Sequence, residues 1–328
     1  MQQRTLTRLG RNVSVIGLGC WQLGADWGSV DDDTAMRILH AAADAGVTFF
    51  DTADVYGDGR SERFVGRLLR ERSGEGLMAA TKTGRRARAQ VDAEYTEANI
   101  RAWIDRSRSN LGVDRLDLVQ WHCPPTDTFA RESMYELFDS LVTEGAIAGY
   151  GVSVETVEQA RMAIAHPHIA TLQIIANAFR RKPFETVIPE AAAAGVGVIV
   201  RVPLASGLLA AKFDASTTFA ADDHRAYNRE GQAFDVGETF SGVPYDIGVA
   251  AARELAGFAP AGVTPAQAAL RWIIDQPGVS TVIPGASSVA QATANAAVAA
   301  LAPTTAAYDD AVRRIYDRDI RAHVHGRW

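Results

Sequence analysis

Cysteine is scarce in this sequence, which has only Cys20 and Cys123 in 328 residues. Two cysteines so far apart, in a chain long enough to bury a sizeable core, predict neither a disulfide framework nor a cysteine metal site. Both lie in apolar runs, so we expect buried free thiols. This cysteine usage is consistent with a cytoplasmic location.

Long hydrophobic runs and an excess of positive charge are also missing. No apolar run reaches the roughly 18 residues that a membrane helix needs. Arginines precede an apolar stretch that begins at Val13, loosely as in a signal peptide, but three glycines and Gln22 interrupt that stretch. The net charge of −6, from 33 basic and 39 acidic residues, is unlike the basic balance of most nucleic-acid-binding proteins. We therefore expect neither a membrane nor a nucleic acid as a partner.

The sequence does contain eight short apolar runs that are nearly continuous. Runs of this kind are typical of parallel strands that are covered on both faces. The runs are VSVIGLGCW (13–21), VTFFDTA (47–53), LMAATKTG (77–84), LDLVQWHC (116–123), IAGYGVSV (147–154), TLQIIANA (171–178), GVIVRVPLA (197–205) and VSTVIPGA (279–286).

Amphipathic helical patterns lie between these runs, and several carry end signals. Aspartates can cap a helix over 31–46, which Gly46 can end. Thr264 followed by a proline can begin another helix over 264–278. Further helices are predicted at 61–72, 96–112, 133–145, 156–166 and 183–195.

Alternation of strands and helices, repeated eight times without a break in composition, predicts an α/β fold. We expect a single-domain (β/α)8 TIM barrel over residues 1–328. An open doubly wound sheet is the competing geometry, but GLGCWQLG after the first strand lacks the G-x-G-x-x-G spacing typical of that fold. A long polar loop at about 206–241 would follow strand seven on the face where barrel active sites lie, and disorder of its middle is the alternative.

Four reactive side chains fall at or just after consecutive predicted strand ends. Asp51 ends the second strand and Tyr56 follows it, while Lys82 and His122 end the third and fourth strands. Alone, each could be a turn or a packed core residue. In a barrel, however, these strand ends share one rim, where ionisable groups are typical of catalysis. Their coincidence predicts an active site.

The blocks that carry these residues resemble a known family. DTADVYGDGRSE, ATKTG and VQWHCPP are similar to three signature blocks of the aldo-keto reductase family, and GLGCWQLG and VIPGASS are similar to its first and last blocks. The resemblance covers nearly the whole chain, in the right order, and is to bacterial-type members close to the branch with potassium-channel β-subunit-like reductases. It implies a barrel that binds NAD(P)(H) without a Rossmann domain and reduces aldehydes and ketones to alcohols.

The resemblance also implies a role for each catalytic position. Tyr56 would give its proton to the carbonyl oxygen as hydride arrives at the carbon. Lys82 would favour the phenolate, and Asp51 would hold Lys82 in place. His122 would donate a hydrogen bond to the carbonyl oxygen. Trp21, at the rim after the first strand, would line the substrate pocket, and no metal is expected.

Cofactor contacts follow from the same resemblance, with some departures. Ser153 and Gln173 match positions that hold the nicotinamide carboxamide, but Val154 stands where the family usually has asparagine. Arg201 takes the place of a stacking tyrosine, as in the branch that uses arginine. NADPH is expected over NADH as the family default, although the adenosine block has no Lys or Arg for a 2′-phosphate. The other expected contacts are Pro203, Leu204, Ser206, Leu208, Gly285, Ser287, Gln291 and Asn295.

Two other functions compete with that of a free reductase of small carbonyl compounds. A cofactor-binding regulatory barrel with little turnover would keep the same four residues, but the short segment before the first strand favours the free enzyme. A barrel hydrolase would need paired carboxylates or metal ligands at the rim, and the sequence pattern shows neither. Trp121 is expected to point outward against a helix, and His323, His325 and Trp328 are expected at the surface or in a tail.

Overall fold

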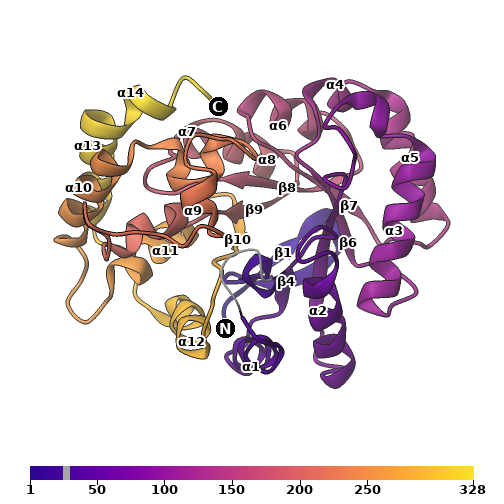
Figure 1. The fold of residues 1–328 in the computed structure, drawn as a ribbon, viewed down its shortest axis with the longest axis horizontal. Helices are drawn as coiled ribbons and strands as arrows, with labels where there is room; N and C mark the ends of the chain where they lie inside the picture. The colour runs from indigo at the N-terminus through magenta and orange to yellow at the C-terminus, as the bar shows by residue number, and fades with distance from the viewer. Residues whose placement is uncertain (25–29) are drawn as a thin grey trace.

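The protein is built around eight parallel strands that form a barrel (Figure 1). The computed structural model describes residues 1–24 and 30–328. Neighbouring strands in the sheet follow one another along the chain, from β3 to β10. A bridge between Gly19 of β3 and Gly285, just after β10, brings the two edges of the sheet together. The predicted (β/α)8 barrel is therefore confirmed, and the open doubly wound sheet is wrong.

Each barrel strand overlaps one of the eight predicted apolar runs. The strands are β3 (Leu18–Gly19), β4 (Phe49–Asp51), β5 (Met78–Thr83), β6 (Leu118–His122), β7 (Tyr150–Ser153), β8 (Ile169–Ile175), β9 (Gly197–Arg201) and β10 (Val279–Val282).

The first run does not form a single strand, because its first residues belong to a hairpin that the sequence pattern did not predict. Strands β1 (Gln3–Leu6) and β2 (Arg11–Ser14) pair antiparallel across a turn that ends at Gly10, whose φ is 61°. Leu6 and Val13 of the hairpin are fully buried against Phe49, Met78 and other residues from the first positions of the barrel strands. The hairpin thus covers the end of the barrel opposite the strand C-termini.

Strand alternation separates the polar residues of the interior from the apolar residues that face the helices. Trp121 shows the outward side, since its ring packs at 4.8 Å from Tyr135 and 5.5 Å from Phe138, both in α5 (Glu132–Thr143). The predicted outward orientation of Trp121 is therefore confirmed. Its neighbour His122 consequently faces the barrel mouth.

Helices surround the barrel, and the predicted end signals operate (Figure 1). Asp31 accepts a hydrogen bond from the backbone of Thr34, and Thr264 forms a capping box with Gln267. The remaining helices are α1 (Asp32–Asp44), α2 (Arg60–Glu71), α3 (Glu97–Leu111), α4 (Thr126–Phe129), α6 (Val157–Ile164), α7 (Lys182–Glu185), α8 (Val187–Ala193), α9 (His224–Tyr227), α10 (Tyr245–Ala256), α11 (Pro265–Asp275), α12 (Val289–Ala297), α13 (Ala306–Ile315) and α14 (Arg321–Val324).

The helix predicted over 183–195 is divided into α7 and α8. Thr186 leaves the helical region, with φ −133° and ψ −92°. Pro189 has no N–H to donate to the carbonyl of Glu185, so the helical bond that would span the break cannot form.

The segment after β9 contains the short 3₁₀ turns at Ala205–Ala210, Val236–Glu238 and Phe240–Gly242 as well as α9. Trp328 is only 7% exposed, so its expected surface position was wrong. Among the described residues, none of the helices is long and apolar enough to cross a bilayer.

We predict that Gly66→Ala will lower the free energy of unfolding by about 1–3 kcal/mol. Helix α2 crosses α3 so closely that a Cβ on Gly66 would overlap the backbone carbonyl of Leu111. Urea unfolding followed by circular dichroism measures the effect. Gly326→Ala is the control, because a Cβ there would meet no described atom within 4 Å. Equal stability of the two variants would contradict the close crossing.

Candidate active site

The carboxyl ends of the barrel strands open into a pocket of about 1600 Å³. Most of the residues predicted for the site lie in its wall. Those residues are Trp21, Asp51, Tyr56, His122, Gln173, Arg201, Pro203, Leu204, Ser206, Gly285, Ser287, Gln291 and Asn295. Three predicted residues, Lys82, Ser153 and Leu208, are almost fully buried and do not line it.

Lys82 lies at the centre of the site and is only 1% exposed. Its ammonium forms an ion pair with the carboxylate of Asp51 and donates to the carbonyl oxygen of Thr52 at 2.8 Å. The same Nζ lies 3.4 Å from the hydroxyl oxygen of Tyr56. The structure thus brings together three side chains from two strand ends and a loop, as the barrel topology required.

Asp51 is held from its other side by two amide groups. Its Oδ2 accepts hydrogen bonds from Gln173 Nε2 at 2.8 Å and from Gln120 Nε2 at 3.1 Å. Gln120 was not predicted, although its place two residues before His122 puts it on the same inward face of β6. Gln173, expected at the nicotinamide, uses its amide nitrogen on Asp51 and has Oε1 3.5 Å from the Ser153 hydroxyl.

Burial and neighbouring charges shift three pKa values in the site. Burial alone would lower the pKa of Lys82, but the Asp51 carboxylate and Tyr56 raise it above its ordinary value. Burial raises the pKa of Tyr56, and the Lys82 ammonium opposes that rise. Burial, reinforced by the charges of Arg85 and Lys82, places the pKa of His122 well below 6.5. At neutral pH the site therefore holds a charged lysine, a protonated tyrosine and a neutral imidazole.

The rings of His122 and Trp21 both pack against Tyr56. The ring of His122 lies 5.9 Å from the Tyr56 ring, edge to face, and that of Trp21 lies 6.0 Å away, stacked. Trp21 also contacts Phe234 and His224 of the long segment, at 5.8 and 5.1 Å between ring centres. Trp21 and Phe234 line the pocket together with Tyr56, so this part of the wall carries aromatic surface.

Arg201 is held in the pocket wall by Glu238, by the carbonyl of Val154 and by the Cys123 thiol, which accepts from Nη2 at 3.6 Å. Its Nη1 forms an ion pair with Glu238 at 2.5 Å, and its Nη2 donates to the carbonyl of Val154 at 3.0 Å. Arg85 lies beside this pair, 3.5 Å from Glu238 and 3.3 Å from Glu155. Neither glutamate nor Arg85 was predicted, although Arg85 follows the ATKTG block directly.

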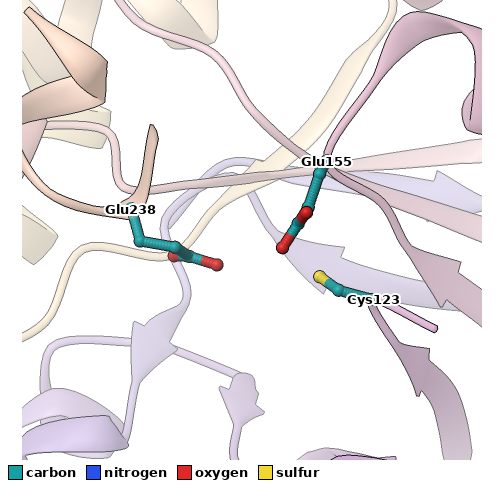
Figure 2. Close-up of side chains that lie close together, drawn as sticks. All are labelled: Cys123, Glu155 and Glu238. Carbon is teal, nitrogen blue, oxygen red and sulfur yellow. The ribbon is translucent and has the colours of Figure 1, made fainter. Parts of the chain in front are cut away.

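Cys123 completes this group, and its Sγ faces the two glutamates (Figure 2). The expectation that both cysteines are simply buried holds for Cys20 but not for Cys123, which is partly exposed in the pocket wall. The thiol and two carboxylates have ligand atoms within 4.8 Å of one another, a spacing that could hold a metal ion. Both carboxylates, however, are already paired with guanidinium groups, so we interpret the group as an ion-pair network.

Of the four cofactor contacts predicted between Pro203 and Leu208, Ser206 and Leu208 have structural partners within the protein, whereas Pro203 and Leu204 line the pocket. Ser206, with φ 53°, donates its hydroxyl to the carbonyl of Glu238 at 3.0 Å and accepts from the backbone of Phe240 at 3.1 Å. Its hydroxyl therefore already anchors the long segment. Leu208 packs beneath the wall against Gly248 and leaves Pro203 and Leu204 at the surface of the pocket.

The far end of the pocket is formed by the N-terminus of α12. Ser288 caps this helix by accepting from the backbone of Gln291, and the Gln291 side chain accepts from the backbone and hydroxyl of Ser287 at 2.8 and 3.0 Å. Asn295 donates to the carbonyl of Gly285 at 3.2 Å. A helix N-terminus with neutral donors is suited to a phosphate group.

Comparison with known proteins agrees with this geometry. Residues 15–316 match the sequence model of the Aldo/keto reductase family. The aldo-keto reductase YhdN of Bacillus subtilis (strain 168) is 32% identical over 298 residues, which are 89% of this chain and 86% of that protein. The glycerol dehydrogenase AKR11B4 from Gluconobacter oxydans is 30% identical, with a TM-score of 0.78 over 97% of this chain and 96% of its own.

A second solved structure, the holo form of the aldo-keto reductase AKR11C1 from Bacillus halodurans, is 27% identical and has a TM-score of 0.75 over 96% of each chain. The family match covers nearly the whole barrel, including every strand that contributes to the site. The chain therefore belongs to the aldo/keto reductase family and is an oxidoreductase.

Proposed function

We propose that this chain reduces an aldehyde or ketone to an alcohol, with a hydride from NADPH and a proton from Tyr56. The observation that carries the proposal is the position of Lys82, whose ammonium contacts the Asp51 carboxylate and also lies 3.4 Å from the Tyr56 hydroxyl. A lysine buried in this way has few roles other than to tune the acidity of the neighbouring phenol.

The side chains act on the oxygen of the substrate. When bound, NADPH supplies the hydride to the carbonyl carbon. Negative charge then grows on the carbonyl oxygen, and Tyr56 gives it the proton of its hydroxyl. Lys82 stabilises the phenolate that is left, while Asp51 keeps the charge of Lys82 compensated. His122, as a neutral imidazole, can donate one N–H to the same oxygen.

The pocket fits a long dinucleotide. It is lined continuously from Tyr56 and His122 at one end to Gln291 and Asn295 at the other. Arg201 has a buried Nε that bonds to none of the described residues, so one donor remains for a ligand. The residues that would contact the cofactor are Gln173, Arg201, Pro203, Leu204, Ser206, Gly285, Ser287, Gln291 and Asn295, while the buried Ser153 and Leu208 would support them from behind the pocket wall.

The substrate would be a small carbonyl compound held between Trp21 and the Tyr56–His122 pair. We also propose that the protein works in the cytoplasm as a free enzyme, without a nucleic acid or membrane partner. The pocket wall near Tyr56 combines aromatic rings with the charged network of Arg85 and Glu155. A polar substrate would therefore find donors and acceptors there.

Tyr56→Phe is expected to abolish carbonyl reduction, because the variant has no proton to deliver. NADPH affinity should stay within about threefold, since the hydroxyl is proposed to act on the substrate oxygen only. Absorbance at 340 nm measures turnover with a panel of aldehydes and ketones, and quenching of tryptophan fluorescence measures binding. Turnover that survives in the variant would refute Tyr56 as the acid.

The rate of reduction should be nearly independent of pH from about pH 6 to about pH 9. The pKa of Tyr56 is raised above 10, so the acid stays protonated until the pH exceeds that value. The pKa of His122 lies well below 6.5, so no charge appears on it as the pH falls through that value. Profiles of kcat at saturating substrate test this. A step in kcat near pH 6.5 that disappears in His122→Asn would contradict a neutral His122.

NADPH should bind more tightly than NADH, but by a modest factor, because Ser287 and Gln291 are neutral donors. Gln291→Arg should tighten NADPH about fivefold and leave NADH within about twofold, since only NADPH has the 2′-phosphate. Fluorescence titrations of wild type and variant with both cofactors measure the change. Ala290→Ser at the neighbouring position of α12 is the control. Equal or tighter binding of NADH by the wild type would overturn the preference.

A further inference from the structure

Trp328 is inserted behind the wall of the pocket. Its indole N–H donates to both carboxylate oxygens of Asp235, at 2.9 and 3.1 Å. The guanidinium of Arg180 lies over its ring, 3.8 Å from the ring centre. The side chain is therefore held by a hydrogen bond and by a cation–π contact, and it is nearly buried.

The segment 235–242 is shaped around this indole. Gly242 has φ 75°, and a Cβ there would overlap the Trp328 ring. A Cβ on Gly237 would lie 2.5 Å from Nη1 of Arg180 and 3.1 Å from Cε2 of Trp328. Two glycines of one short segment thus make room for the same side chain.

The opposite side of the same segment faces the active site. Glu238, which is 9% exposed, lies between Gly237 and Gly242 in sequence and forms the 2.5 Å ion pair with Arg201. The Ser206 hydroxyl donates to its carbonyl oxygen. Glu238 therefore holds the guanidinium of Arg201 from the side of this segment, while the carbonyl of Val154 holds it from the end of β7.

Arg180 connects the indole to the other half of the ion-pair network. Its Nη2 donates to the carbonyl oxygen of Glu155 at 3.0 Å, and the Glu155 carboxylate pairs with Arg85. Trp328 consequently contacts the supports of both arginines of the ion-pair network, Arg201 through Asp235 and Arg85 through Arg180.

We propose that Trp328 is a positioning residue for the cofactor site, which holds segment 235–242 so that Glu238 sets the place of Arg201. The proposal rests on the proposed function, because it takes Arg201 and Ser206 as cofactor contacts. Without the indole, Asp235 loses a donor, Arg180 loses its aromatic partner, and Gly237 and Gly242 face a void. Glu238 then has a mobile backbone, and the cofactor must order the segment when it binds.

The test compares Trp328→Ala and Trp328→Phe with two controls. Trp272→Phe is the matched control, because its indole also donates to an aspartate, Asp309, at 2.9 Å, away from segment 235–242. His323→Ala removes an exposed side chain of the same terminal region. Hydrogen exchange of the free proteins, read by mass spectrometry, reports segment 235–242, whose amides of Glu238, Thr239 and Gly242 are hydrogen-bonded. Fluorescence titration gives the Kd of NADPH, and initial rates separate kcat from KM.

In Trp328→Ala, exchange in segment 235–242 should rise at least about tenfold, and the Kd and KM for NADPH should rise about tenfold as well, while kcat at saturation changes less than about threefold. Trp328→Phe should raise exchange and the Kd by an intermediate factor of about threefold, since it keeps an aromatic ring beside Arg180 but loses the N–H that Asp235 accepts and part of the ring volume. The two controls should leave exchange in this segment and the Kd unchanged.

Three results would overturn the positioning role. The first is a Trp328→Ala variant in which exchange rises by the same factor in segment 235–242 and in the rest of the chain, which would indicate a purely global loss of stability. The second is a looser segment with an unchanged Kd. The third, if Trp328→Ala does not fold, is a Trp328→Phe variant with wild-type exchange and Kd. A wild-type protein that binds no NADPH would instead refute the proposed function, and the exchange measurement would still show whether Trp328 holds the segment.

Discussion

The buried ion pair between Lys82 and Asp51 is the interaction on which the rest of the site depends. An ammonium that is 1% exposed is costly to bury unless its charge is compensated and its donors are satisfied. Here the carboxylate compensates the charge, Thr52 accepts a further hydrogen bond, and Gln120 and Gln173 satisfy the second oxygen of Asp51. The barrel must close in the observed register for these groups to meet. The Lys82 ammonium can then act on the Tyr56 hydroxyl, which lies 3.4 Å away.

The ion pair between Arg201 and Glu238 differs from the pair between Lys82 and Asp51 in the elements that support it. The pair formed by Lys82 and Asp51 stands on two neighbouring strands, which are rigid. Arg201 also ends a strand, but its partner Glu238 belongs to the long segment after β9. The position of the Lys82–Asp51 pair is thus set by the sheet, whereas the position of the Arg201–Glu238 pair also depends on how the long segment after β9 packs. This difference is the basis of the proposal that Trp328 influences cofactor binding.

Local signals predicted the helices well where one residue decides the end of an element. Asp31 and Thr264 cap their helices, because capping needs only a side chain and a backbone N–H three residues away. Prediction was wrong where distant packing decides. The hairpin β1–β2 exists because Leu6 and Val13 cover the barrel end, and Trp328 is buried because two glycines leave room for it. Neither cause is visible in the neighbouring sequence.

The amino-acid pattern was enough to predict the barrel and the rim at which Asp51, Tyr56, Lys82 and His122 meet. Eight apolar runs alternating with helices specify parallel strands, and a strand period of two places each polar end on a known face. The partners of the site residues, in contrast, become known only from the folded chain. Gln120 at Asp51, Glu238 at Arg201 and Asp235 at Trp328 are pairs of residues far apart in the chain. Such pairs depend on strand register and loop packing, which arise only when the whole chain is folded.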